Sequence, residues 1–129
     1  MARGRELHQL RITQRQALGK PLSRRARSKC ELCQESSPLE ATELLPTPNE
    51  PISEWALLLC KQCQPLLTIP PSIDNASRLQ FLHETIWSEI EPIQITSIRL
   101  VKQLEKMGTP WVQGMLDSLY IDPDTERKL

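Results

Sequence analysis

The sequence has 129 residues, a length that suits one domain with a modest hydrophobic core. Hydrophobic residues make up 39% of it and aromatic residues only 4%, so we expect a core of leucine and isoleucine in a mostly helical fold. It contains no apolar run of the roughly 18 residues that a membrane span requires, and its N-terminus lacks the apolar centre of a secretory signal. We therefore expect a soluble, cytoplasmic protein with no membrane partner.

The formal net charge is zero at pH 7, but the charges are unevenly distributed. Residues 1–30 contain nine Lys or Arg and one acidic residue, a net charge of +8, which the other 99 residues balance with −8. Such asymmetry indicates either a basic arm that binds a polyanion or two parts of one chain that attract each other. An arginine-rich N-terminus is also typical of a mitochondrial transit peptide, although no change of composition separates it from the residues that follow.

Two helices are predicted in the basic N-terminal region. Leu7 and Leu10 lie at helical spacing with later apolar residues, which predicts a first helix over 3–18, with Gly19 just past its end. Proline is favoured at the first position of a helix, so a short second helix is predicted over 21–27. This second helix brings three arginines close to the first cysteine.

Prolines dominate the next part of the chain. Those between residues 36 and 53 leave room only for a short strand over 39–45 before a loop takes over. Residues 55–59 form a continuous apolar run, which fits either a buried strand or the approach to a helix.

Three helices are predicted in the C-terminal half. The first begins at Asp74 or Asn75, carries apolar residues every three or four positions, and ends at Pro92. The second covers 93–107, and the third covers 110–120. The tail after them is polar and acidic, and we expect it to be a solvated end.

All four cysteines occur as two CxxC pairs, and 26 residues separate the pairs. Two residues between cysteines allow both thiolates to reach one ion, and two such pairs supply the four sulfurs of a tetrahedral zinc site. Disulfides and a thioredoxin-type redox site are the alternatives, but nothing indicates secretion, and no strand-and-helix repeat precedes the two matched pairs. The sequence therefore predicts one structural Zn²⁺ with the ligands Cys30, Cys33, Cys60 and Cys63.

The segments RRARSKCELC, ALLLCKQC and WSE resemble the N-terminal zinc-ribbon region of the bacterial PhnA-like proteins, and the likeness extends over nearly the whole chain. The resemblance implies that the four cysteines are the zinc ligands. Longer members carry a small β-barrel after the zinc region, whereas the residues after the second cysteine pair here have a helical pattern. The family name comes from phosphonate-utilisation genes, but no residue set here is suited to cleaving a carbon–phosphorus bond.

The order of cysteine pair, strand, proline-rich loop and cysteine pair is also similar to the zinc-stabilised HNH endonucleases. In that family, histidines of a D-H-I-x-P motif between the pairs bind a catalytic cation and activate water. The corresponding stretch here is ATELLP, and no histidine lies between Cys33 and Cys60. Glu40 and Glu43 could hold Mg²⁺ in principle, so a nuclease stays as a disfavoured alternative.

Other candidate site residues are few. His8 and His83 are the only histidines, and His83 lies in an apolar helical pattern, where a packed or boundary histidine is expected. The three tryptophans are expected in the core. The remaining candidate surface is the basic arm, six of whose cations could follow a phosphate backbone: Arg11, Arg15, Arg24, Arg25, Arg27 and Lys29.

Together these features predict a small zinc-ribbon or treble-clef unit with four cysteine ligands and short strands, flanked by α-helices in a mostly α-helical protein. We divide the chain into a basic helical arm over 1–29, the zinc-binding unit over 30–69 and a helical region over 70–129, packed as one compact domain. The predicted function is a non-catalytic interaction module that contacts DNA or RNA through the arm. A protein-interaction module is the alternative, and an HNH-like nuclease is the less favoured one.

Overall fold

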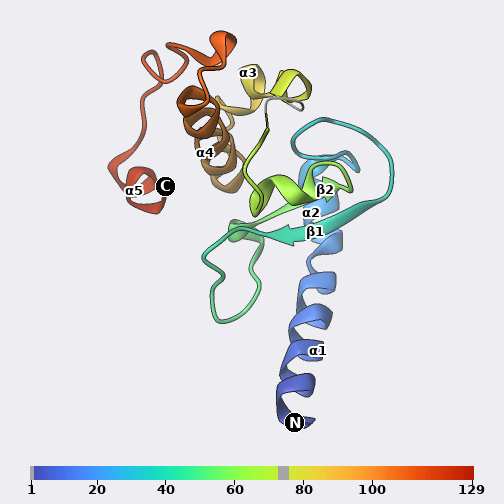
Figure 1. Ribbon diagram of the computed structural model, residues 1–129. Helices are drawn as coiled ribbons and strands as arrows, with labels where there is room; N and C mark the ends of the chain where they lie inside the picture. Colours follow the sequence, from blue (N-terminus) through green and yellow to red (C-terminus); the bar gives the residue numbers. More distant parts are fainter. Residues whose placement is uncertain (1, 73–75) are drawn as a thin grey trace. The chain divides into compact units, whose positions relative to one another are not determined.

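The computed structural model describes residues 2–72 and 76–129 (Figure 1). The chain divides into two compact units, Met1–Pro65 and Leu66–Leu129. The first unit contains two α-helices and a β-hairpin, and the described elements of the second unit are helical. Within the described ranges, no helix has the length and apolar character that crossing a membrane would need.

Helices α1 (Ala2–Ala17) and α2 (Gly19–Ala26) follow each other almost without interruption. Leu18, the residue between them, keeps helical backbone angles, with φ −74° and ψ −12°. Gly19, which was predicted to lie past the end of the first helix, is therefore the first residue of the second. Pro21 lies in the first turn of α2, where its missing N–H leaves no helical hydrogen bond unmade.

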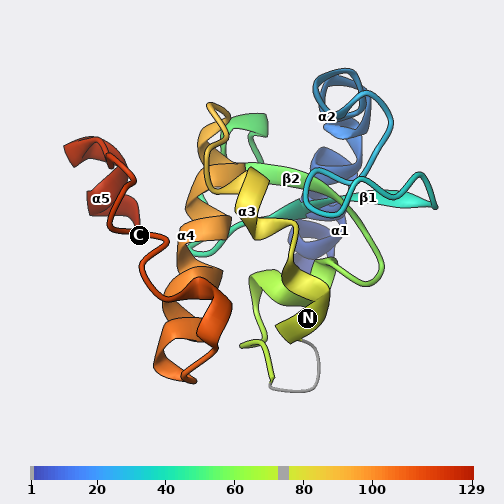
Figure 2. The same cartoon turned by 90° about the horizontal axis from the view of Figure 1, so that it is seen from above.

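Strands β1 (Leu39–Glu43) and β2 (Ala56–Cys60) form an antiparallel hairpin (Figure 2). Ala41 lies opposite Leu58 in this hairpin. The 3₁₀-helix η1 (Ser53–Trp55) leads into β2. All five residues of β2 are buried, so the apolar run that periodicity left undecided is a strand. The predicted first strand is confirmed, although it ends two residues earlier than expected.

Helix α2 packs on the hairpin through the fully buried Leu22. The apolar cluster around it is small and consists of Leu22, Ala41, Ala56 and Leu58, with Leu18, Ala26 and Leu39 at its margin. The start of α1 is different, because residues 4–10 are all exposed. Leu7 and Leu10, the leucines that predicted this helix, are 60% and 52% exposed.

Helix α4 (Glu91–Lys106) is the longest element of the second unit and confirms the helix predicted over 93–107. Helix α3 (Leu82–Thr85) lies beside it (Figure 2). The 3₁₀-helices η3 (Ala76–Leu79) and η4 (Pro110–Val112) and helix α5 (Pro123–Lys128) complete the described elements. The core cluster of this unit is formed by Ala76, Leu79, Leu82, Ile86, Ile98, Leu100, Val101, Leu104 and Val112.

Two predicted helices of the second unit are shorter than expected. The helix before Pro92 consists of one 3₁₀ turn and one α turn, and its predicted caps Asp74 and Asn75 lie outside the described residues. Pro92 belongs to the first turn of α4 and does not end a helix, since no N–H is needed there. The helix predicted over 110–120 is wrong beyond its first turn, because turns follow and Gly114 adopts a left-handed φ of 83°.

The acidic tail forms α5, which contacts α4. Asp122, Asp124 and Glu126 are exposed, as predicted for a solvated end, although Thr125 between them is buried. The side chain of Asp122 caps α5 by accepting a hydrogen bond from the Asp124 N–H at 3.0 Å. The Lys128 ammonium group pairs with the Glu91 carboxylate at 2.6 Å. The backbone carbonyl of Lys128 accepts a hydrogen bond from the Arg99 side chain at 2.8 Å.

The tryptophans are less buried than predicted. Trp55 and Trp111 are half-buried, and Trp87 is 54% exposed, so a core position is wrong for Trp87. The indole N–H of Trp55 donates to the Pro46 carbonyl at 2.8 Å. The centre of the exposed His83 ring lies 5.2 Å from the centre of the Trp111 ring. This contact of an exposed ring agrees with the prediction of a boundary histidine.

Candidate metal centre

The hairpin of the first unit brings the two cysteine pairs together. Cys30 and Cys33 lie in the loop between α2 and β1. Cys60 is the last residue of β2, and Cys63 lies in the turn just before the 3₁₀-helix η2 (Gln64–Leu67). Because β1 and β2 are antiparallel, the loop that enters β1 reaches the end of β2.

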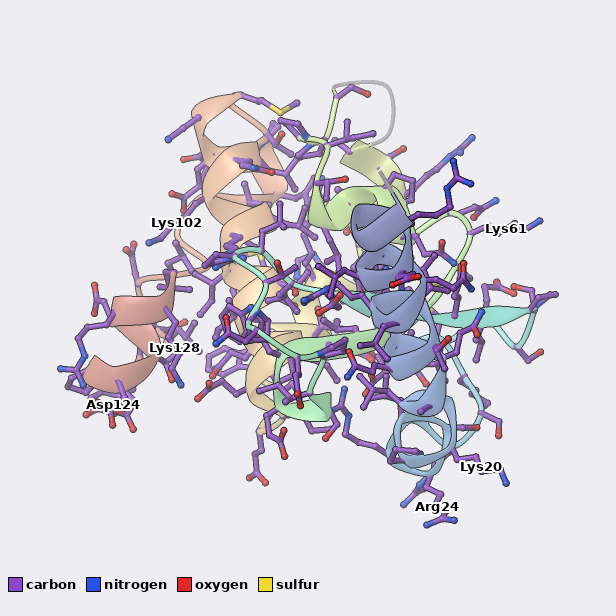
Figure 3. All side chains as sticks on the ribbon, turned by 90° about the horizontal axis from the view of Figure 1, so that it is seen from below. Lys20, Arg24, Lys61, Lys102, Asp124 and Lys128 are labelled. Carbon is purple, nitrogen blue, oxygen red and sulfur yellow. The ribbon has the colours of Figure 1, made fainter. Side chains whose placement is uncertain are left out.

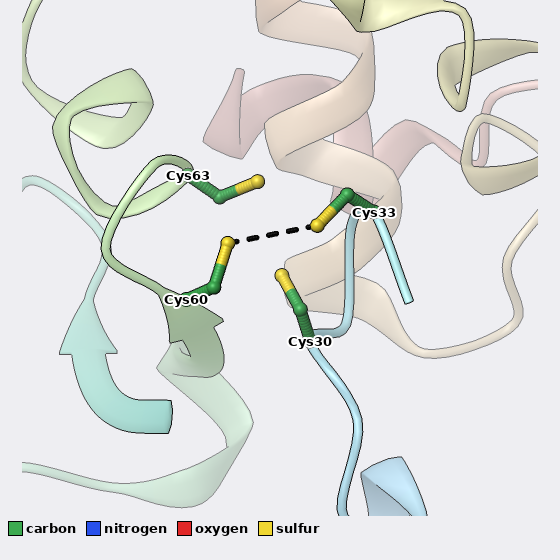
Figure 4. A group of neighbouring side chains, drawn as sticks. All are labelled: Cys30, Cys33, Cys60 and Cys63. Carbon is green, nitrogen blue, oxygen red and sulfur yellow. Dashed lines mark hydrogen bonds between the residues drawn. The ribbon is translucent and has the colours of Figure 1, made fainter. Parts of the chain in front are cut away.

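The four sulfur atoms point toward a common centre (Figure 4). All of them lie within 4.8 Å of one another, and the sulfurs of Cys33 and Cys60 are 3.6 Å apart. A zinc ion bound tetrahedrally at about 2.3 Å from each sulfur would hold its ligands about 3.8 Å apart. The cluster therefore has the right size for a metal ion. Cys30, Cys60 and Cys63 are buried and Cys33 is half-buried, so protein surrounds most of it.

Backbone hydrogen bonds fold each pair into a tight turn. The Gln34 N–H donates to the Cys30 carbonyl at 3.0 Å, and the Cys30 N–H donates to Glu35 at 2.8 Å. In the second pair, the Cys63 N–H donates to the Cys60 carbonyl at 3.1 Å. Gln34 has a φ of 68°, which turns the chain back after the first pair. All four cysteines are free of disulfide bonds, so both turns present thiols.

The thiols change one another's pKa values because they are buried together. A hydrogen bond with Cys63 is the main reason that the pKa of Cys30 is lowered to about 4, against the opposing effect of burial. Burial is the main cause that raises the pKa of Cys33 to about 11. The pKa of Cys63 is also raised, first by its hydrogen bond with Cys30 and then by burial. A metal ion must therefore displace protons from Cys33 and Cys63, so its apparent affinity rises with pH.

Sequence reasoning missed Glu31, a buried residue between the first two cysteines. Its carboxylate accepts two hydrogen bonds from Arg25, at 2.7 and 2.8 Å, and one from the Leu58 N–H, also at 2.8 Å. A signal for this pair was present, because an acidic residue beside thiolates is unfavourable unless a cation balances it. Arg25 precedes Glu31 by six residues in the same basic stretch.

The six predicted phosphate-binding cations fall into two groups. Arg11 donates to both carboxylate oxygens of Glu43, at 3.0 and 2.6 Å, and to the carbonyls of Pro48 and Asn49. The hydrogen bond with Glu43 is the main cause that raises the pKa of Arg11. Arg25 is bound in the same way to both carboxylate oxygens of Glu31. These two guanidinium groups are engaged within the first unit.

The other group consists of Arg15, Arg24, Arg27 and Lys29. Arg24, Arg27 and Lys29 are exposed, and Arg15 is half-buried. Figure 3 shows the Arg24 side chain extending outward from α2. Within the part of the chain that the structure describes, none of the four forms an ion pair. They are the arm cations that remain available to an external anion.

The structure separates the two carboxylates that could have held Mg²⁺ between the cysteine pairs. Glu40 and Glu43 lie on opposite faces of β1, because side chains alternate along a strand. Glu40 is exposed, whereas Glu43 is buried and paired with Arg11. These two residues therefore do not form a shared cation site.

The chain matches no protein-family model, no curated protein and no solved structure at a significant level. The resemblance to PhnA-like proteins therefore stays a prediction from the sequence motifs. The cysteine cluster is the feature from which a function can be inferred.

Proposed function

We propose that Cys30, Cys33, Cys60 and Cys63 bind one structural zinc ion, and that the unit around them is a non-catalytic interaction module that contacts nucleic acid. The observation that carries the metal site is the cluster of four sulfurs within 4.8 Å of one another. The order of cysteine pair, hairpin and second cysteine pair supports a treble-clef or zinc-ribbon arrangement. The motif RRARSKCELC supports membership of the PhnA-like family.

Zinc is the ion that this ligand set favours. Four thiolates in a tetrahedral arrangement are typical of structural Zn²⁺, and four protein ligands leave no open position for a catalytic water. The bound site would carry a formal charge of −2. Lys29 and Lys61 are exposed next to ligands in the sequence, where they can offset part of that charge.

The nucleic-acid surface is proposed on those predicted arm cations that have no carboxylate partner among the described residues. Arg24 lies in the last turn of α2, and Arg27 and Lys29 follow in the turn that leads to Cys30. A bound metal would hold the end of this turn in place, so the cations would be presented in a defined arrangement. Guanidinium groups bind phosphate oxygens in pairs, which suits contacts along a nucleic-acid backbone.

The test is binding of the zinc-loaded protein to labelled duplex DNA and to RNA over a series of salt concentrations. Four phosphate contacts on duplex DNA give a slope of about −3.6 in log affinity against log salt. Replacing both Arg24 and Arg27 by Gln should make the slope shallower by about 1.8.

The matched control replaces two exposed lysines of α4, Lys102→Gln and Lys106→Gln, which removes the same charge from the other unit. It should change neither slope nor affinity appreciably. An equal loss in both double variants would mean that only net charge matters, and no binding at about 50 mM salt would retire the nucleic-acid proposal.

A protein-interaction module is the second candidate, and the exposed leucines of α1 favour it. Leu7 and Leu10 lie one turn apart with both side chains more than half exposed. Apolar side chains at this spacing are typical of a helix that docks into a groove of another protein. In this case the protein would bind neither DNA nor RNA at low salt, and partner binding would depend on the two leucines.

A further inference from the structure

A carboxylate is buried inside the first cysteine pair. The Glu31 side chain, between Cys30 and Cys33, is 1% exposed. A carboxylate removed from water needs hydrogen-bond donors and a compensating charge. Beside four thiolates, it also adds negative charge to a centre that is already negative. Electrostatic attraction to the cysteines therefore does not explain the position of Glu31. The hydrogen bonds that its carboxylate forms explain it.

Arg25 holds this carboxylate from α2. Its Nε and Nη2 donate to the two oxygens of Glu31, at 2.8 and 2.7 Å. The same guanidinium donates to the carbonyls of Ser53, at 2.9 Å, and Ala56, at 2.8 Å. A planar guanidinium with five N–H groups can serve these acceptors together, whereas the ammonium group of a lysine cannot. Arg25 thus joins α2, the first cysteine pair and the start of β2.

Glu31 also joins the first cysteine pair to the strand that carries Cys60. Its N–H donates to the Leu58 carbonyl at 2.9 Å, and its Oε1 accepts from the Leu58 N–H at 2.8 Å. Residue 31 is next to Cys30, and Leu58 is two residues before Cys60. The backbone therefore has little freedom to separate the first ligand of one pair from the first ligand of the other.

We propose that Arg25 and Glu31 are positioning residues that hold the two cysteine pairs at ligand distance, so that the metal ion meets a preorganised set of thiols. The inference rests on the proposed zinc site and deepens it. Residues that orient metal ligands without touching the ion typically change metal affinity by about 10- to 100-fold when they are replaced. Preorganisation has this effect because less of the binding energy is lost in ordering the ligands.

The sign of the effect separates positioning from simple electrostatics. Neutralising Glu31 removes a negative charge beside a site with a formal charge of −2. If charge alone mattered, a Glu31→Gln variant would bind zinc as tightly as the wild type or more tightly. Positioning predicts weaker binding, because glutamine can still accept from Leu58 but cannot hold Arg25 with two oxygens.

The first unit contains a matched control for this experiment. Arg11 and Glu43 form an ion pair of the same kind, with two bonds to the carboxylate and two to loop carbonyls. Glu43 pairs with Ala56 at the end of the hairpin away from Cys60. A Glu43→Gln variant therefore loses a similar ion pair that is not attached to a cysteine pair.

The experiment measures zinc affinity by competition with a chromophoric chelator for the wild-type full chain and for Glu31→Gln, Arg25→Lys and Glu43→Gln. We expect a loss of about 10- to 100-fold for Glu31→Gln and Arg25→Lys and less than about threefold for Glu43→Gln. The absorption spectrum of the Co²⁺-loaded proteins should show tetrahedral thiolate coordination in all four, which confirms that the ligands themselves are unchanged.

Two results would overturn the inference but leave the proposed zinc site in place. One is a Glu31→Gln affinity equal to or above that of the wild type, and the other is an equal loss in Glu31→Gln and Glu43→Gln. If Glu31→Gln does not fold even with zinc, the zinc affinity of Arg25→Lys is compared with that of Glu43→Gln instead. Arg25→Lys keeps the positive charge and removes only the planar guanidinium group. A wild-type protein that binds no zinc would instead overturn the proposed function, and the positioning role with it.

Discussion

The two units of this protein stabilise their buried polar groups in different ways. Among the described residues of the first unit, the buried polar ones are the carboxylates Glu31 and Glu43, each paired with an arginine. In the described part of the second unit they are hydroxyls, and two of them bond to carbonyls one turn earlier in α4. Ser97 donates to Ile93 and Thr96 to Pro92, both at 2.8 Å. The Ser97 hydroxyl also bonds to the Thr85 hydroxyl of α3 at 2.7 Å, so these groups are satisfied inside an apolar helical core without charges.

This difference shows which interactions each unit depends on. A buried ion pair holds a precise geometry, but it contributes little net stability because both charges lose their hydration. The internal cluster of the first unit includes two alanines, although four leucines outside it are also buried in that unit, whereas the cluster of the second unit consists largely of leucine, isoleucine and valine. We therefore expect the first unit to depend on the metal ion and the second on apolar burial.

Removal of the metal should have the largest effect and should be confined to the first unit. Structural zinc contributes about 10–16 kcal/mol in small finger peptides, more than the stability of a typical domain. The purified protein should contain one zinc per chain, and a strong chelator should disorder residues 30–63. Hydrogen exchange followed by mass spectrometry should then show lost protection in the first unit and retained protection in α4.

Added zinc should restore the original exchange pattern, which separates metal loss from irreversible damage. If protection stays unchanged after metal loss is confirmed, the first unit folds without its metal. Equal loss of protection in both units would mean that they unfold together, and the comparison between them would fail.

Truncation of the second core should have the next largest effect. Leu104 is fully buried in the apolar cluster of α4, so Leu104→Ala should lower the free energy of unfolding by about 2–5 kcal/mol. Urea unfolding followed by circular dichroism measures this change. Zinc affinity should stay the same, because the four cysteines belong to the other unit.

The control is Leu7→Ala, which removes the same atoms from an exposed position and should change stability by no more than about 0.5 kcal/mol. A large change in zinc affinity for Leu104→Ala would show that the core of the second unit supports the metal site.

Substitution of a strained residue beside the metal site should give the smallest effect. Arg27 ends α2 in the left-handed region, with a φ of 56°, and the Ser28 N–H donates to the Ser23 carbonyl at 2.9 Å. Glycine is preferred at this position of a helix end. Arg27→Gly should therefore raise the free energy of unfolding by up to about 1 kcal/mol, measured on the zinc-loaded protein.

Arg24→Gly provides the opposite case, because it lies inside α2 and should destabilise by about 1 kcal/mol. Both variants lose one exposed arginine, so they should weaken DNA binding to a similar degree. If Arg27→Gly destabilises the protein as much as Arg24→Gly, the Arg27 side chain makes a contribution that outweighs its backbone strain.

Local patterns predicted the elements whose residues interact with near neighbours. The helix over 93–107 was predictable because its apolar residues repeat every three or four positions, and eight of its residues from Ile93 to Leu104 are buried. The helix expected over 110–120 failed because the chain turns at Gly114 with a left-handed φ, and the apolar residues around this glycine outweighed its signal as a helix breaker. The same kind of reasoning could not tell that Trp87 would be exposed, since periodicity predicts a face and not what covers it.

The sequence by itself determined the cysteine cluster, because the spacing within each CxxC pair is a local property and a hairpin of suitable length joins the pairs. Only the tertiary structure decided which arm cations are available and which carboxylates are buried. Arg11 and Glu43 are 32 residues apart, and Arg25 and Ala56 are 31 residues apart. Pairings over such separations depend on how α1 and α2 pack against the hairpin, and no local pattern encodes that packing.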